Sequence, residues 1–383
     1  MTSINAESLY RSKLGLAEGK SLSDVGEKKL LGEYLLPICR AVCGDQGLGD
    51  DAATLTVPAG NDIVVTTDRA PSDLLPRQFG LMSSMEFGAY VVRVNVSDLA
   101  AMGAVPLGIV LTCAFPPDEK LIHVLQFMWG AYTEGADLGC PVVGGDTKAS
   151  VEESVSASAV GAVPTGRSVR RGPIKPGMSV YLSGPVGHAG VALRWFAHKT
   201  YNERSRLDTD LESLDQEFRE YLVRPRPRID LARSLSESGT QCAMDITDGL
   251  GQTLAEIATQ SNVNIEIDFD SLIIRPSIIR AAELLGLDMH NVLGGIGIDL
   301  ELVAVGWENP SSKDFYPIGR VVDGPGEVSF QGWGPMPRGG FEHFTMKPRD
   351  YLRLFRHGSE APPGYCDVPI LMAVRCSTAV VGV

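Results

Sequence analysis

Apolar residues follow two spacings along the first half of the chain, and each spacing predicts one kind of element. Residues 63–67 form an apolar, β-branched run that ends at Asp68, which predicts a buried strand feeding a loop. Between residues 80 and 102, apolar side chains recur every three or four positions, which predicts a helix with one apolar face. Residues 107–115 predict a second strand, and residues 121–138 predict a second amphipathic helix.

The alternation of strands and helices continues to about residue 330. A short strand at residues 142–143 is predicted to end at the turn Gly144-Gly145-Asp146-Thr147, and a longer strand covers residues 154–163. Further along, the pattern predicts a strand at 178–182, a charged helix within 200–222, an extended connector at 224–228, a helix at 229–238, a strand into Asp245 and a helix at 250–261. Because some links have only hairpin length, we expect the α/β fold class with mixed (α+β) sheets.

The chain is long enough for more than one domain. At roughly 150 residues per domain, 383 residues suggest two or three. Residues 166–177 are basic and rich in glycine and proline, which is typical of a crossing segment. We therefore predict a domain of residues 1–165, an α/β domain of residues 166–345, and an extension of unknown structure at residues 346–383.

Composition and charge exclude several kinds of partner. The formal net charge of −13 argues against nucleic acid and against an anionic membrane, because both are polyanions. No apolar stretch reaches the roughly 20 residues that span a bilayer, and the first ten residues lack the apolar core of a signal peptide. The 7 cysteines are scattered, which favours buried free thiols over disulfides or zinc. We expect a cytoplasmic protein.

Aspartates flanked by small residues recur at predicted loop tips, and they are the main chemical signal. Any one of them is ordinarily a turn or a helix cap. Five such places within about 200 residues favour a shared function instead. The places are Gly49-Asp50-Asp51, Thr66-Thr67-Asp68, Asn95-Val96-Ser97-Asp98, Gly144-Gly145-Asp146-Thr147 and Asp245-Ile246-Thr247-Asp248-Gly249.

Clustered aspartates suit a hard cation that is bound together with phosphate. Mg²⁺ prefers oxygen ligands, usually a few carboxylates completed by water and phosphate oxygens. Asp245 and Asp248 flank a predicted helix start, where Thr247 could donate its hydroxyl to a phosphate and where the helix favours an anion. Asn95 and Asp98 share one helical face. The usual phosphate-loop and dinucleotide-binding spacings are absent from the sequence.

These motifs, in this order and spacing, resemble the thiamine-monophosphate kinase family of the aminoimidazole ribonucleotide synthetase superfamily. The resemblance covers roughly residues 30–345 and includes Asn95 to Pro106, Arg171-Gly172 with Lys175-Pro176-Gly177, and Gly339 to Phe344. It implies a two-domain fold whose N-terminal half pairs with its copy in a homodimer, with ATP in a cleft between the halves. The positions that match the family's metal ligands are Asp50, Thr66, Thr67, Asp68, Asp98, Asp146, Asp245 and Asp248.

The resemblance also assigns nucleotide contacts. Those positions are Gly145, Asp146, Arg171 and Thr247, and the catalytic roles fall to Asp98, Asp146 and Arg171. The family usually has serine where this chain has Thr247, and either hydroxyl would serve. Arg171 would bring a fixed positive charge to a phosphate oxygen. The alternative interpretation is that Arg171 is an ordinary solvent-exposed arginine in a basic loop.

The positions that would bind the phosphate acceptor depart from the family pattern. Leu75 stands where the family has a histidine that meets the substrate, and Ile298 stands in place of a substrate-binding glutamate. The glycine-rich stretch at residues 294–302 is also two residues longer than the family motif. Losing a buried polar contact typically costs about 1–3 kcal/mol. The change indicates either another acceptor, which we favour, or loss of function.

The resulting expectation is an ATP- and Mg²⁺-dependent kinase acting on a small molecule, either thiamine monophosphate or another acceptor. One alternative is an ATP-dependent synthase that activates an amide or carboxylate oxygen as a phosphate. A second alternative is a nucleotide-binding protein without turnover. The acidity then excludes nucleic acid but not nucleotides, because metal ions would offset the charge of the aspartates.

Overall fold

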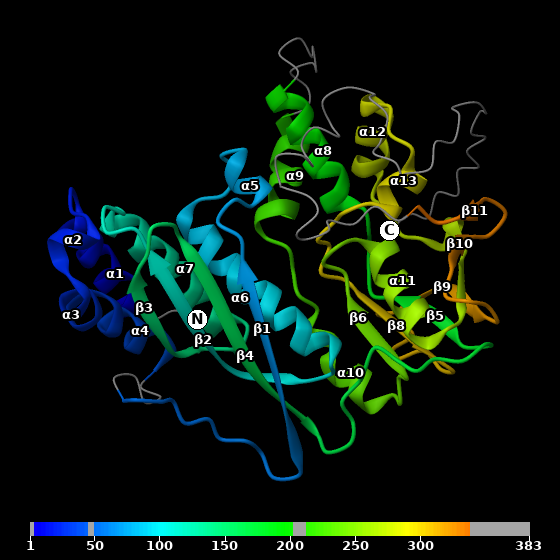
Figure 1. Ribbon diagram of the computed structural model, residues 1–383, viewed down its shortest axis with the longest axis horizontal. Coiled ribbons are helices and arrows are strands. Elements are labelled where there is room, and N and C mark those ends of the chain that lie inside the picture. The colour runs from blue at the N-terminus through cyan, green and yellow to red at the C-terminus, as the bar shows by residue number, and fades with distance from the viewer. Residues whose placement is uncertain (1–3, 45–49, 202–211, 338–383) are drawn as a thin grey trace.

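A computed structural model describes residues 4–44, 50–201 and 212–337 of the chain, which are built around two β-sheets (Figure 1). The first sheet has the strand order β1-β4-β2-β3, and the second has the order β11-β10-β7-β9-β5-β8-β6. Both sheets are mixed: β2 and β3 pair in parallel within the first, β7 and β10 pair in parallel within the second, and the other pairs are antiparallel. The expected mixed α/β class is confirmed.

Among the described residues, helices cover only one face of the first sheet. Its strands are β1 (Asn61–Ala70), β2 (Val105–Phe115), β3 (Val142–Ala149) and β4 (Ser154–Pro164). The covering helices are α6 (Ser84–Ala101) and α7 (Leu121–Asp137), and behind α7 lie α1 (Ile4–Ala17), α2 (Leu22–Val25), α3 (Glu27–Lys29), η1 (Leu30–Leu35) and α4 (Leu36–Cys43). The short α5 (Leu75–Gln78) follows β1.

The second sheet is packed on both faces. Its strands are β5 (Ser179–Leu182), β6 (Cys242–Asp245), β7 (Asn264–Ile267), β8 (Leu302–Gly306), β9 (Tyr316–Val322), β10 (Val328–Phe330) and β11 (Gly334–Pro335). The remaining elements are α8 (His188–Tyr201), α9 (Glu212–Val223), η3 (Ile229–Leu231), α10 (Ala232–Glu237), α11 (Leu250–Ser261), η4 (Phe269–Ser271), α12 (Pro276–Leu285) and α13 (Met289–Gly294). Helix α11 covers one face, and the end of α6 packs with Ala100 and Ala101 against Tyr181, Leu302 and Ala304 on the other.

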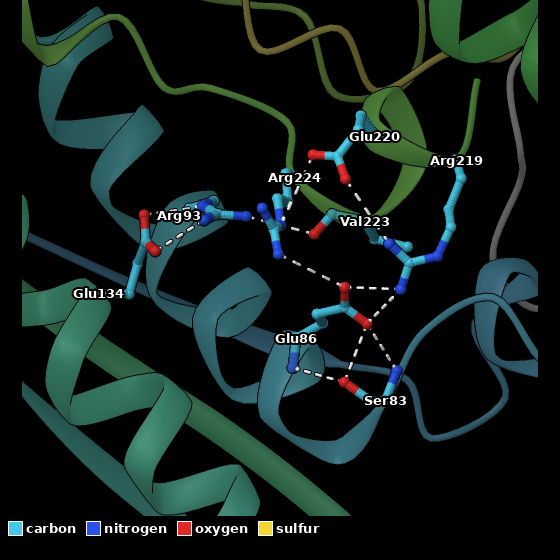
Figure 2. A network of polar contacts seen from close by, with 8 residues as sticks. All are labelled: Ser83, Glu86, Arg93, Glu134, Arg219, Glu220, Val223 and Arg224. Atoms are coloured by element: carbon cyan, nitrogen blue, oxygen red, sulfur yellow. Dashed lines mark hydrogen bonds and ion pairs between the residues drawn. The ribbon is translucent and has the colours of Figure 1, made fainter. Parts of the chain in front are cut away.

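Helix α6 therefore belongs to the cores of both sheets, and a second contact fastens its first turns. Figure 2 shows this contact, which we call the α6–α9 clasp: Glu86 and Arg93 of α6, Glu134 of α7, and Arg219 with Val223 of α9. Nη2 of Arg219 donates to both oxygens of Glu86 at 2.6 and 2.7 Å. Arg93 forms a forked pair with Glu134 and donates to the carbonyl of Val223 at 3.2 Å, so it also caps the end of α9.

Glu86 has two tasks in the clasp. Besides binding Arg219, its carboxylate accepts the N–H and the hydroxyl of Ser83 at 2.9 Å each, which closes a capping box on α6. Burial acts to raise the pKa of Glu86, but hydrogen bonds from Arg219 and Ser83 outweigh it and hold that pKa below its ordinary value. The clasp is therefore present with full charge at neutral pH.

The structure confirms the predicted helices at 80–102, 121–138 and 250–261 within a few residues. Two strand predictions were wrong in part. The strand at residues 63–67 is not buried: β1 is an edge strand, and Ile63 and Val65 on its uncovered side are 59% and 65% exposed. Nor does the chain turn at residues 144–147, because β3 continues through Asp146 to Ala149, paired with β2.

Other expectations fall partly outside the described residues. The charged helix predicted within 200–222 corresponds to the end of α8 and to α9, and residues 202–211 between them are not described. Residues 338–383, with the predicted family motif near 340 and the extension, also lie outside, and the domain boundary at 165/166 stays a prediction. The five described cysteines are buried free thiols, as expected. None of the described helices could span a membrane.

We expect the substitution Glu86→Gln to lower the free energy of unfolding by about 1–3 kcal/mol at pH 7, the usual loss when a charged hydrogen bond is removed. Glutamine can retain the capping box, so the loss reports the ion pairs of Glu86 with Arg219 at 2.6 Å and with Arg224 at 3.9 Å. Because the pKa of Glu86 is lowered in the folded state, this stabilisation is lost as the pH falls through that pKa. Urea unfolding measures it, with Glu33→Gln as the control because Glu33 pairs with Lys29 in solvent. Equal effects of the two substitutions would contradict the clasp.

Candidate functional site

The second half of α6 holds three polar side chains that reach two strands, one in each sheet. The buried Asn95 accepts the backbone N–H of Asp68 through Oδ1 at 3.1 Å, and its Nδ2 donates to the carbonyl of Val91 at 2.9 Å. Asp98 accepts the hydroxyl of Thr66 at 2.6 Å. The hydroxyl of Ser97 donates to Asp245 at 2.6 Å, across to the second sheet.

These contacts tie Asp68 and Asp245 to the helix that carries Asp98, and the charge of Asp248 acts on Asp68. We call these four aspartates the carboxylate site. Burial raises the pKa of Asp68, and the charges of Asp98 and Asp248 raise it further. The pKa of Asp245 is raised to about 7, chiefly by burial and then by Asp98. Burial also raises the pKa of Asp98, against the hydrogen bond from Thr66 and the charge of Arg171. The site therefore holds more negative charge than its neighbours compensate.

The start of α11 closes one side of the carboxylate site. Strand β6 ends at Asp245, and the loop through Thr247 and Asp248 leads into a helix that begins at Leu250. Gly249 is required at the turn: its φ is +101°, and a Cβ there would lie 2.0 Å from the carbonyl oxygen of Gly295. The predicted strand, loop and helix start are thus confirmed, and the first N–H groups of α11 lie next to the aspartates.

Arg171 reaches the carboxylate site from the crossing segment. The carbonyl of Arg170 accepts the N–H of Ala243 at 3.0 Å, so this segment runs beside β6 toward Asp245. The guanidinium of Arg171 lowers the pKa values of Asp98 and Asp245, which places its charge near both. Its Nη1 donates to Glu256 of α11 at 3.2 Å.

The remaining predicted residues lie on other surfaces. Thr67 and Asp146 belong to the uncovered face of the first sheet, opposite Ser158 and Thr112 in the strand register, whereas Thr66 and Asp68 face α6. Asp146 pairs with Lys148 at 3.3 Å. Gly145 beside it is needed for packing, because a Cβ there would lie 2.1 Å from the carbonyl oxygen of Leu111.

Asp50 is exposed where a described stretch begins. No contact that the structure resolves among the described residues links Asp50, Thr67 or Asp146 to the carboxylate site, so their roles as ligands stay predictions. Sequence reasoning missed Ser97, Glu256 and Tyr90. The pKa of the buried Tyr90 is raised by burial and then by the charges of Asp68 and Asp248. A small polar residue between Asn95 and Asp98 was the available signal for Ser97.

The donor chemistry fits Mg²⁺ bound together with phosphate. In the described part of the chain, no three His, Cys, Asp or Glu side chains are arranged to hold a metal ion by themselves. Mg²⁺ is commonly held by one or two carboxylates, with phosphate oxygens and water completing the shell. The raised pKa values of Asp68, Asp98 and Asp245 indicate carboxylates whose charge a divalent cation would compensate.

A second region lies beside the carboxylate site, at the ends of three helices. A narrow cleft there is lined by Gly187, Gly249, Leu250, Val292, Leu293, Gly295, Ile296, Gly297 and Asp299. Asp299 accepts the N–H groups of Gly187 and Ala189 at 2.8 and 3.0 Å, so its carboxylate already caps α8. Leu75 and Ile298 both pack against the apolar cluster of α8, α9, α12 and α13 beside this cleft.

Comparison with known proteins places these features in a family. The model of the AIR synthase related protein N-terminal domain matches residues 49–163, and that of the C-terminal domain matches residues 175–330. A thiamine-monophosphate kinase of Methanospirillum hungatei is 31% identical over 318 residues, which are 81% of this chain and 98% of the relative. A carbamoyl dehydratase HypE of Rhizobium leguminosarum is 28% identical and covers 82% of this chain and 89% of its own.

A solved structure agrees with these matches. The crystallised protein described as AaThiL complexed with AMPPCP and TMP has a TM-score of 0.64 and 25% identity, and the alignment covers 83% of this chain and 99% of that one. The expected two-domain fold is confirmed by this likeness and by the paired family models. The chain belongs to the AIR synthase related protein family, and it is similar there to thiamine-monophosphate kinases.

Proposed function

We propose that this chain is an ATP- and Mg²⁺-dependent kinase that phosphorylates a small molecule. The observation that carries the proposal is the carboxylate site: α6, a helix of the first sheet, carries Asp98 and is bonded through Ser97 to Asp245 of the second sheet, and the charges of Asp98 and Arg171 both act on Asp245. Carboxylates, a fixed guanidinium and a helix N-terminus together form the charge pattern that binds a metal–phosphate chain. The kinase relatives and the nucleotide analogue named in the AaThiL structure support the same activity.

The chain's own residues would position and neutralise the phosphates. Arg171 would hold a phosphate oxygen, and Thr247 with the first N–H groups of α11 would bind another. Bound Mg²⁺ would neutralise developing charge on the phosphoryl group. Asn95 and Ser97 would hold Asp68 and Asp245 in place through the hydrogen bonds already described. We assign no general base, because a phosphate acceptor needs none and positioning supplies most of the catalysis.

The acceptor is the part in which we expect this chain to differ from thiamine-monophosphate kinases. Leu75 and Ile298, the two residues at the departing positions, lie far apart in sequence but pack against one apolar cluster. Neither can replace a polar contact to a substrate. Both positions that would contact the acceptor in the family are apolar here and lie at one cluster. This supports a different acceptor rather than random loss of substrate-binding residues.

An assay of ATP turnover over a set of small-molecule acceptors, with thiamine monophosphate included, tests the proposal. We expect Mg²⁺-dependent formation of ADP and a phosphorylated acceptor, with kcat/KM for thiamine monophosphate at least about tenfold below that of the best acceptor, since one lost polar contact already costs about that much. Mass spectrometry of the products decides the outcome. ADP with free phosphate and a dehydrated or cyclised product would instead indicate the synthase, and binding without turnover would contradict catalysis.

Two substitutions test the metal assignment. We expect Asp98→Asn and Asp146→Asn each to weaken binding of Mg²⁺ with a non-hydrolysable ATP analogue about 10- to 100-fold, because loss of a ligand costs at least as much as loss of a supporting contact. Calorimetric titration gives the affinities. Asp118→Asn is the control, because Asp118 is an exposed loop residue distant in sequence from both motifs. Unchanged affinity in both variants would refute the metal site.

We further propose that the uncovered face of the first sheet pairs with a second copy of the chain. Ile63, Val65 and Val105 lie on this face and are 59%, 65% and 48% exposed. Ile63 and Val105 both pair with Ala162 of the strand between them, so the three apolar side chains form one patch. Large exposed apolar patches mark interaction surfaces more often than free surface.

Light scattering after size-exclusion chromatography tests this pairing. We expect a dimer for the unaltered protein and a monomer for Val65→Asp, because a buried unpaired charge opposes association. Val151→Asp should remain dimeric, since Val151 is 92% exposed but lies in the turn after β3. A monomer in the unaltered protein, or a dimer in both variants, would exclude this face.

A further inference from the structure

Backbone hydrogen bonds on both sides of Arg171 fix the position from which its side chain projects. On one side, the N–H of Val169 donates to the carbonyl of Met102 at 3.1 Å, and Arg170 pairs with β6. On the other side, the N–H of Ile174 donates to the hydroxyl of Ser261, at the end of α11, at 3.1 Å. The segment is thus held between the end of α6, β6 and α11, and Arg171 projects from a fixed point.

The guanidinium of Arg171 has an acidic partner outside the carboxylate site. Glu256 accepts its Nη1 at 3.2 Å, and the other oxygen of Glu256 accepts Nε2 of Gln252 at 3.3 Å. Glu256 lies six residues after the first residue of α11, about 9 Å along the helix at 1.5 Å per residue. It therefore draws Arg171 along α11, away from the helix N-terminus where phosphate would bind.

We propose that Glu256 is an internal competitor for Arg171, and that it sets the affinity of the protein for the metal–nucleotide complex. The proposal rests on the proposed function, in which Arg171 binds a phosphate oxygen. A guanidinium presents a fixed fork of donors, and a carboxylate and a phosphate oxygen match that fork in the same way. Phosphate binding at Arg171 must therefore replace or share the contact with Glu256.

The size of the effect follows from the exposure of the pair. The side chains of Arg171 and Glu256 are 51% and 37% exposed, so solvent screens their attraction. Exposed pairs are weak, and the exchange of this partner for phosphate corresponds to about a two- to fivefold change in affinity. Glu256 thus adjusts affinity without preventing binding, and the effect shrinks as salt increases.

The substitution Glu256→Gln tests the proposal by calorimetric titration with Mg²⁺ and a non-hydrolysable ATP analogue. We expect the dissociation constant to fall about two- to fivefold, because glutamine keeps the shape and removes the competing charge. Glu266→Gln is the matched control: Glu266 of β7 pairs with Arg320 of β9 at 2.8 Å, and β9, β5 and β8 separate β7 from β6, the strand that ends at Asp245. The affinity of this variant for the nucleotide analogue should not change. Unchanged or weaker binding in Glu256→Gln would overturn the inference.

The double variant separates this inference from the proposed function. Glu256→Gln should not change the dissociation constant when Arg171 is replaced by methionine, because no guanidinium is then present for Glu256 to bind. If Arg171→Met alone binds the analogue as tightly as the unaltered protein, the proposed role of Arg171 fails. A different result would refute only the competition between Glu256 and Arg171. In that case Arg171→Met binds the analogue weakly, but adding Glu256→Gln still strengthens binding, which means that the charge of Glu256 acts on the ligand directly.

Discussion

The hydrogen bond between Ser97 of α6 and Asp245 of β6 is the contact on which the arrangement of the site depends. It crosses from a helix of the first sheet to a strand of the second, and both partners are buried. A buried carboxylate without a donor is costly, so this pairing fixes the approach of the two sheets at the point where the aspartates meet. Asn95, two residues before Ser97, and Asp98, the residue after it, then attach β1 to the same helix.

A helix can perform this role only if its sequence is polar on the side that faces the site and apolar elsewhere. Val91, Val92, Val96 and Leu99 bury α6 among the first sheet's helices, and Ala100 and Ala101 are small enough to let the second sheet approach. The N-terminal turns are held by the clasp with α9, and the C-terminal turn is held by packing. Asn95, Ser97 and Asp98 thus lie on a helix that is held at both ends, which is the pre-organisation that the proposed activity requires.

Much of this could be predicted from sequence, for identifiable reasons. The helix at 80–102 and the turn from Asp245 into α11 have strong local patterns, a 3.6-residue apolar repeat and a glycine before a helix start. The exposure of Ile63 and Val65 could not be predicted, because an apolar β-branched run looks the same whether its second face is covered by the chain or left open. Two adjacent glycines suggested a turn at Asp146, but pairing with β2 keeps the strand extended. The contact of Glu256 with Arg171 could not be predicted, because the two residues lie 85 positions apart in the sequence.

The double use of Glu86 couples two events that are separate in most proteins. One carboxylate accepts hydrogen bonds from Ser83 in the first turn of α6 and from Arg219 of α9. Displacement of this carboxylate would therefore weaken the helix cap and the contact with α9 together, which makes local opening at this end of α6 costly. Each sheet has its own core, and the clasp ties α6 of the first core to α9, so we expect the two parts to unfold cooperatively, together with the carboxylate site that lies between them.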